Sequence, residues 1–123
     1  MADHTLRYDQ EHGFVHVTFT GTVDLRVIQE VAPQVARLCG ENNCHRILND
    51  MSRAHIGITV MEAFDSPAIM EQSHISRSIR RALILPPDFT ESRFLETISQ
   101  NRGHNLKVFS SAADAQDWLL KDP

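Results

Sequence analysis

The side chains best suited to chemistry follow a short predicted strand at residues 45–49. Asp50, Ser52 and His55 supply a carboxylate, a hydroxyl and an imidazole close together in the chain. Ligands of open α/β sheets gather outside the carboxyl ends of the strands, which makes these residues candidates for binding a ligand or a partner. Catalysis there would require two titrating groups that reach a common pocket. A simpler interpretation makes His55 a solvated loop residue.

Familiar catalytic motifs are absent from the sequence. It has no glycine-rich dinucleotide or phosphate loop, no His-Glu-x-x-His and no Gly-x-Ser-x-Gly. Cys39, Cys44 and His45 form a Cys-x4-Cys-His group, but a structural zinc site usually has four ligands from paired clusters. We therefore predict no catalytic residue, no metal and no cofactor. Cys39 is interpreted as an apolar residue at a helix end, and Cys44 as one at a strand entry.

Length and composition are typical of one globular domain. The chain has 123 residues, and 41% of them are hydrophobic, so we predict a single domain over residues 1–123. The formal net charge of −4 argues against nucleic acid as a partner, because binding to phosphates requires a basic surface. The first residues lack the basic and apolar segments of a secretory signal. Together with two thiols interpreted as reduced, this leads us to expect a cytoplasmic protein.

The first third of the sequence predicts a hairpin and a helix. Period-2 alternation indicates strands at residues 5–9 and 14–19, with Gly21 closing the second strand. Thr22 is a plausible cap for the helix that follows. Pro33 lies inside the helical pattern, which predicts a kink or a break there.

Three further strands alternate with three helices along the rest of the chain. The strands are predicted at residues 45–49, 80–85 and 106–109, with a loop over residues 50–58. The helices are predicted to begin at the capping residues Thr59, Asp88 and Ser111. Strands linked by helical crossovers are usually parallel. The sequence therefore predicts an α/β fold with a mixed sheet of about five strands, an antiparallel hairpin followed by parallel strands, and about four helices.

The helix predicted from Thr59 belongs to the most apolar stretch outside the strands. Thr59 and Glu62 have the spacing of a capping box, and Ile58, Met61 and Phe64 lie beside them. If the helix carries more apolar surface than one face can bury, the excess marks a contact surface or a ligand slot. Packing in the core is the alternative.

A basic cluster precedes the fourth predicted strand. It consists of Arg77, Arg80 and Arg81, with His74 nearby. Such a cluster can contact an anionic lipid or an acidic partner. A solvated strand entry is the alternative interpretation.

Four segments of the sequence carry a recognisable pattern, namely Phe19-Thr20-Gly21 and residues 47–52, 81–85 and 108–119. Together with the order of elements, and over nearly the whole chain, they resemble the SpoIIAA-like group of small bacterial domains, the STAS and SEC14 type. The last segment is the most specific. It is similar to the family's closing pattern, a Val-x-Phe strand followed by an Ala-x-x-Trp-Leu helix.

This resemblance implies a regulatory or ligand-binding domain rather than an enzyme. In anti-sigma-factor antagonists of the wider family, an Asp-Leu-Ser strand end precedes an Asp-Ser-Ser-Gly helix start, where a serine is phosphorylated. Asp50-Met51-Ser52 resembles the first motif, and only Thr59 offers a hydroxyl at the second. The SEC14 side of the family implies an apolar ligand or a membrane contact, for which residues 56–70 are the candidate segment.

Three functional hypotheses follow, in this order. The first is binding of an apolar or lipid ligand, a membrane surface or a protein partner through the helix from Thr59 and the loop before it. The second is a phosphoswitch protein-interaction domain, modified at Thr59 or Ser52. The third is an enzyme acting around Asp50, Ser52 and His55. The first hypothesis places the protein at the membrane periphery when its ligand is a bilayer, and a homodimer is compatible with all three.

Overall fold

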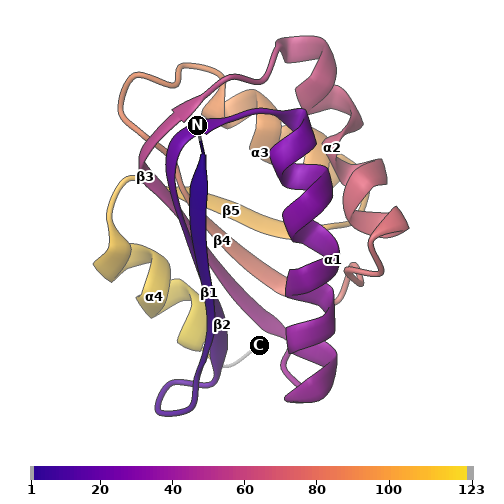
Figure 1. Ribbon diagram of the computed structural model, residues 1–123, viewed down its shortest axis with the longest axis vertical. Coiled ribbons are helices and arrows are strands. Elements are labelled where there is room, and N and C mark those ends of the chain that lie inside the picture. Colours follow the sequence, from indigo (N-terminus) through magenta and orange to yellow (C-terminus); the bar gives the residue numbers. More distant parts are fainter. Residues whose placement is uncertain (1, 122–123) are drawn as a thin grey trace.

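Five strands and four helices alternate along residues 2–121, the part of the chain that the computed structural model describes (Figure 1). The strands are β1 (Asp3–Asp9), β2 (Phe14–Val23), β3 (Arg46–Ile56), β4 (Arg80–Ile84) and β5 (Asn105–Phe109). The helices are α1 (Leu25–Glu41), α2 (Val60–Gln72), α3 (Ser92–Asn101) and α4 (Ala112–Leu120).

The strands form one mixed sheet in the order β1-β2-β3-β4-β5. β1 and β2 are antiparallel, and every later pair is parallel. Helices α1, α2 and α3 lie over one face of this sheet, whereas α4 lies over the other (Figure 1). The predicted α/β fold, with an antiparallel hairpin followed by parallel strands, is confirmed.

β3 is longer than the sequence indicated, because residues 50–56 continue the strand instead of forming a loop. Thr18 of β2 pairs with Asp50, but Thr20 pairs with Arg53, so β3 contains an extra residue between these pairs. Such a β-bulge interrupts the period-2 alternation by which a strand is recognised. The prediction of a loop was therefore wrong, and β2 likewise runs past Gly21 to its end at Val23.

α1 starts later than predicted and is unbroken. Its N-cap is Asp24 rather than Thr22, and Asp24 Oδ1 accepts the Val27 N–H at 3.0 Å. The helix continues through Pro33, so a break there is wrong, and the alternative of a kink stays a prediction. Pro33 and Gln29 both lie on the exposed side of α1, where water can replace the hydrogen bond that the proline removes.

The predicted start of α3 at Asp88 is also wrong. The Phe89 N–H donates to the Pro86 carbonyl at 3.1 Å, and this turn places Asp88 before the helix rather than at its cap. By contrast, the predicted cap of α4 is confirmed, because Ser111 Oγ accepts the Asp114 N–H at 3.2 Å.

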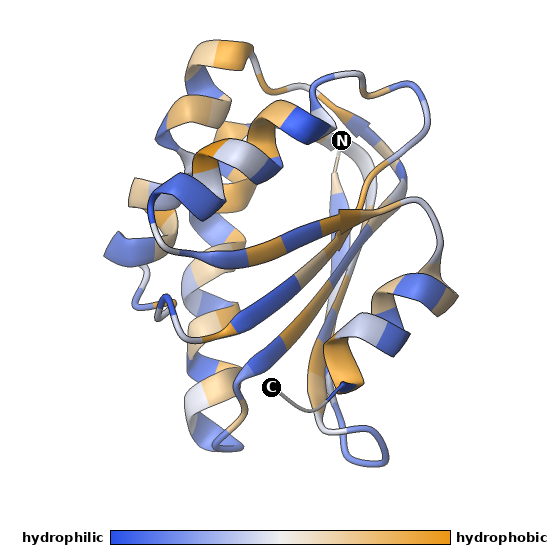
Figure 2. Cartoon of the chain, turned by 180° about the vertical axis from the view of Figure 1, so that it is seen from behind, coloured by the Kyte–Doolittle hydropathy of each residue, from blue (hydrophilic) through white to orange (hydrophobic). Residues whose placement is uncertain are grey.

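Side chains of the sheet contribute to two separate apolar cores. Hydrophilic and hydrophobic residues occur in bands along the strands (Figure 2). The core under α1 includes Val15, Val17, Ile47, Leu83 and Leu106. The core under α4 consists of Phe14, Leu48, Ala82, Ile84, Ala115 and Leu119. Cys39 and Cys44 are buried in the first core, as predicted.

Side chains of α3 occupy the outer edge of β5. Glu96 Oε2 accepts the Val108 N–H at 2.7 Å, and Gln100 Nε2 donates to the Leu106 carbonyl at 3.0 Å. Because β5 ends the sheet, these backbone groups would otherwise lack a strand partner. β1 forms the opposite edge.

Candidate functional site

α2 begins at the capping box that the sequence predicted. Thr59 Oγ accepts the Glu62 N–H at 3.1 Å, and Glu62 Oε1 accepts the Thr59 N–H at 2.9 Å. These two bonds satisfy backbone donors that the first turn of a helix leaves free. The helix packs mainly against its neighbours α1 and α3.

Three large apolar side chains in the first turns of α2 face solvent. Val60 is 48% exposed, Met61 is 80% exposed and Phe64 is 61% exposed. Burial of such side chains stabilises a protein, so their exposure on one helix marks a surface available for contact. α2 therefore carries more apolar surface than it buries, which is the property expected of a contact site.

An apolar cleft with a volume of about 90 Å³ lies beneath α2. Ile58 and the α2 residues Ala63 and Met70 line it, together with Ile28 of α1, Leu83 of β4 and Leu95 of α3. Its polar lining consists of Asn49, Glu62, Ser66, Arg81 and Ser99. Among the residues proposed from sequence, Ile58 thus lines the cleft, whereas Met61 and Phe64 lie on the exposed part of α2.

One charged side chain in the wall of this cleft is buried. Arg81 is only 6% exposed, so the interpretation of all three arginines as a solvated or surface-binding cluster is wrong for this residue. Its Nη2 donates to His104 Nδ1 at 3.3 Å, while its Nε has no hydrogen-bond partner among the described residues. Burial lowers the pKa of Arg81 to about 10, so the guanidinium remains charged at neutral pH.

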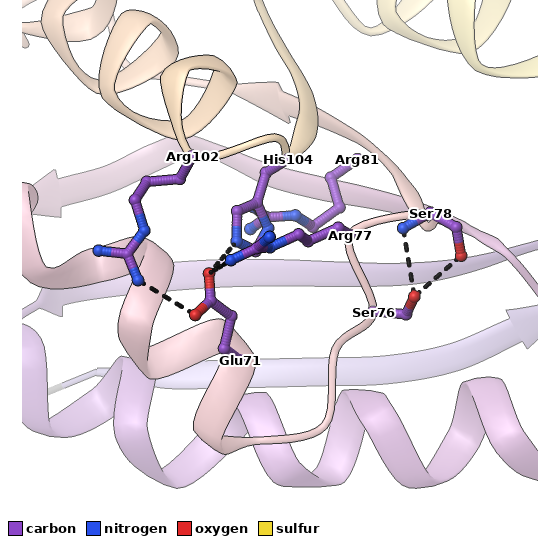
Figure 3. A network of polar contacts seen from close by, with 7 residues as sticks. All are labelled: Glu71, Ser76, Arg77, Ser78, Arg81, Arg102 and His104. Atoms are coloured by element: carbon purple, nitrogen blue, oxygen red, sulfur yellow. Dashed lines mark hydrogen bonds and ion pairs between the residues drawn. The ribbon is translucent and has the colours of Figure 1, made fainter.

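Glu71, near the end of α2, connects this helix to the same cluster (Figure 3). Its carboxylate accepts from His104 Nε2 at 2.9 Å, from Arg102 at 3.1 Å and from Arg77 at 3.2 Å. The hydrogen bond from His104, followed by those from the two arginines, lowers the pKa of Glu71 to about 2.

The same bonds assign the protonation state of His104. Its Nε2 donates to Glu71 and its Nδ1 accepts from Arg81, which together define the neutral tautomer protonated on Nε2. Burial lowers the pKa of His104, in agreement with this state. The neutral imidazole therefore bridges Glu71 and Arg81 through two hydrogen bonds and adds no charge.

Sequence reasoning missed Glu71 and His104 because their partners are distant in the chain. His104 lies 33 residues from Glu71 and 23 from Arg81, separations that no local pattern reveals. One signal was present: Arg81 immediately precedes the apolar run from Ala82. A charged residue entering a buried strand indicates a buried polar contact on one face of the sheet.

Asp50, Ser52 and His55 lie within β3 rather than in a loop. Asp50 Oδ1 accepts the Ser52 N–H at 3.0 Å and the Ser52 hydroxyl at 2.6 Å, bonds that serve the backbone of the bulge. His55 is exposed further along the strand, and none of the three lines the cleft beneath α2. The structure therefore joins Asp50 to Ser52 but places both away from the cleft.

Residues 2–121 offer neither a membrane-spanning helix nor a metal-binding group. No helix in this range combines the length and the apolar character needed to cross a bilayer. The same residues contain no group of three or more His, Cys, Asp or Glu side chains arranged to hold a metal ion.

The hairpin, the three parallel pairings and the placement of α4 opposite the other helices define a SpoIIAA-like α/β domain. Solved structures with this fold resemble the chain over nearly its whole length. An uncharacterised protein of the DUF3478 family from Shewanella loihica, described as having a SpoIIAA-like fold, superposes with a TM-score of 0.62 at 15% sequence identity. This likeness covers 96% of the present chain and 93% of the other.

Two structures of SpoIIAA itself show the same likeness. The anti-sigma factor antagonist SpoIIAA in its unphosphorylated form has a TM-score of 0.54 at 13% identity, covering 94% of this chain and 96% of that one. The Bacillus cell fate determinant SpoIIAA in its phosphorylated form has a TM-score of 0.56 at 11% identity, covering 94% and 98%. No family model and no curated protein matches the sequence. At these identities the likeness establishes the fold.

Proposed function

We propose that the chain is a regulatory protein-interaction domain whose contact surface is α2. The exposure of Val60, Met61 and Phe64 is the observation that carries this proposal. Aromatic residues and methionine are enriched in protein interfaces, which fits Phe64 and Met61. The likeness to SpoIIAA supports an interaction domain more than it supports lipid binding, which was one part of the first hypothesis from sequence.

Thr59 is the group that we propose as the switch. It is exposed at the N-terminus of α2, where free N–H groups and the helix dipole favour a phosphate with a charge of about −2. A phosphate on Thr59 would repel the Glu62 carboxylate and open the capping box beside Met61. Ser52 suits this role less, because the Asp50 carboxylate lies 2.6 Å from its hydroxyl and would repel a phosphate.

The contact surface is tested by photo-crosslinking in the native host. A benzoylphenylalanine at position 61 or 64 should give the same discrete protein adduct, because both positions belong to one surface. The same group at Ala113, an exposed residue of α4, is the control and should give none. Adducts that are equal at all three positions, or absent at positions 61 and 64, would show that α2 is not the contact surface.

The switch is tested by mapping phosphorylation sites on protein purified from the same host. Phosphate is expected on Thr59 in the wild type and in Ser52→Ala, and nowhere in Thr59→Val. Thr59→Glu should also remove the adduct formed at position 61. An unmodified Thr59 under every growth condition would reject the phosphoswitch while leaving the contact surface in place.

The cleft beneath α2 favours a second function, binding of a small apolar molecule. Its lining by Ile58, Met70 and Leu83 is that of a ligand pocket. Titration with neutral 1-octanol should shift the amide NMR signals of α2, α3 and β4 and leave those of α4 unchanged. A spectrum that is unchanged up to the solubility limit of octanol would reject this function.

A further inference from the structure

Arg77 and Arg102 each pair with the Glu71 carboxylate, whereas Arg81 has no paired anion within residues 2–121. Its Nε has no hydrogen-bond partner there either. An ionised group taken out of water requires compensation from a counter-charge and hydrogen bonds. Its described side-chain contact, the long bond to neutral His104, supplies an acceptor without charge.

The charges around Arg81 do not balance. Arg77, Arg81 and Arg102 bring three guanidinium groups to this cluster, and Glu71 is the single carboxylate bonded into it. Both oxygens of Glu71 are already engaged by Arg77, Arg102 and His104. The cluster therefore retains positive charge, and the buried part of that charge is Arg81 in the cleft wall.

We propose that the cleft beneath α2 binds an amphipathic monocarboxylate, whose carboxylate pairs with Arg81. The hydrocarbon chain would lie against Ile28, Met70 and Leu83, which line the same cleft. The inference rests on the second function proposed above and names its ligand class. A guanidinium forms two parallel hydrogen bonds with a carboxylate, and Nε is one of the donors suited to that geometry.

The other polar groups of the cleft are compatible with one anion. Glu62 is the acidic lining residue, and its Oε1 is engaged by the Thr59 N–H at 2.9 Å. Asn49, Ser66 and Ser99 are neutral. A volume of about 90 Å³ is smaller than the apolar cavity of about 150 Å³ that accommodates benzene, so the cleft encloses the carboxylate end of an eight-carbon chain and leaves the rest outside.

The wild-type protein tests the proposal with two probes of equal length. Isothermal calorimetry with octanoate and with 1-octanol compares a carboxylate with a neutral hydroxyl on the same chain. Octanoate should bind at least roughly tenfold more tightly, because only it forms a charge-assisted pair in a buried site. Equal affinities would overturn the role of Arg81 and leave the apolar ligand function standing, whereas absence of binding by both probes would overturn the two together.

Two variants assign the difference to one side chain. Arg81→Met should bring the octanoate and octanol affinities to within roughly twofold of each other, because methionine keeps apolar volume and removes the charge. Arg53→Met removes an exposed arginine of β3 that does not line the cleft, and it should keep the wild-type preference. A preference that survives in Arg81→Met would reject the proposal.

A direct readout avoids dependence on the folding of a variant. The Arg81 Nε–H is buried and has no partner among the residues that the structure describes, so its proton resonance reports on any acceptor that arrives. Octanoate should move this resonance downfield in the wild type, and octanol should move it much less. An Arg81 Nε–H signal that does not respond to saturating octanoate would overturn the proposed pairing even if octanoate binds elsewhere.

Discussion

Two consecutive arginines of β4 illustrate how differently the two faces of the sheet are built. Arg80 points to the α4 face, where its Nη1 donates to the carbonyls of Trp118 at 3.1 Å and Lys121 at 2.6 Å. Its guanidinium also lies 5.3 Å from the centre of the Trp118 ring. Arg81 points to the α2 face and has one hydrogen bond of 3.3 Å, to His104.

The α4 face is therefore complete, in the sense that the protein itself satisfies its buried charge, whereas the α2 face is not. Leu119 and Ala115 of α4 are fully buried against the sheet, and the charge beside them is satisfied by the protein itself. On the other face, the protein leaves a cleft and an unpaired buried charge at Arg81. A complete face is typical of a structural core, and an incomplete one is typical of a binding site.

The largest expected effect separates the packing of the two faces. Leu119→Ala should lower the free energy of unfolding by about 3 kcal/mol, because it leaves a cavity in a fully buried position. Leu95→Ala removes a half-buried residue of the cleft and should lower it by about 1 kcal/mol. Chemical denaturation measures both. Equal losses would show that the two faces are packed equally well.

The next prediction compares the two arginines. Arg80→Met should lower the free energy of unfolding by about 2 kcal/mol, since it leaves three carbonyls without a charged donor. Arg81→Met should change it by less than about 0.5 kcal/mol, or raise it, because it removes a buried charge that lacks an anion. Chemical denaturation measures both changes in the free energy of unfolding. A larger loss for Arg81→Met would mean that the α2 face is complete without a ligand.

A third prediction concerns acid. The pKa of Glu71 is about 2 in the folded protein, below its ordinary value of 4.5, so ionised Glu71 stabilises the fold above pH 4.5 and this contribution is lost as the pH falls toward 2. Stability should therefore fall less steeply over that interval in Glu71→Gln than in the wild type. Asp65→Asn, which changes an exposed carboxylate of α2, should keep the wild-type slope. Thermal unfolding across this pH range measures all three slopes.

The smallest expected effect is on the exposed surface of α2. Met61→Ser and Phe64→Ser should each change the free energy of unfolding by less than about 0.5 kcal/mol, because these side chains are largely exposed. A loss above about 1 kcal/mol in either variant would show that the side chain belongs to the core and is not available to a partner.

The sequence was sufficient for the architecture and insufficient for the boundaries. The hairpin, the parallel order and the caps Thr59 and Ser111 follow from local patterns that the structure keeps. The errors have more than one cause. The bulge beside Asp50 depends on a contact with β2, which is distant in the chain. The wrong caps reflect competing local bonds at Asp24 and at Pro86, and Pro33 lies on the exposed side of α1.

The candidate site was predicted only in part, for a similar reason. Ile58 and the exposed apolar residues of α2 belong to one apolar stretch of the sequence, which includes the start of that helix and the residue before its cap. The charge in the cleft wall does not, because Glu71, Arg81 and His104 come from three separate elements. Their proximity depends on the strand order and on the face of the sheet to which each side chain points. Local patterns in a single sequence reveal neither.

The bonds from Glu96 and Gln100 to β5 also limit how the molecule can associate with copies of itself. A sheet grows only along strands whose backbone groups are accessible, and α3 already occupies that side. Within residues 2–121, β1 is the sheet edge that no such side-chain bond covers. Two copies meeting there would be related by a two-fold axis and would exhaust the available edge, so the assembly would stop at a pair instead of extending into a fibre.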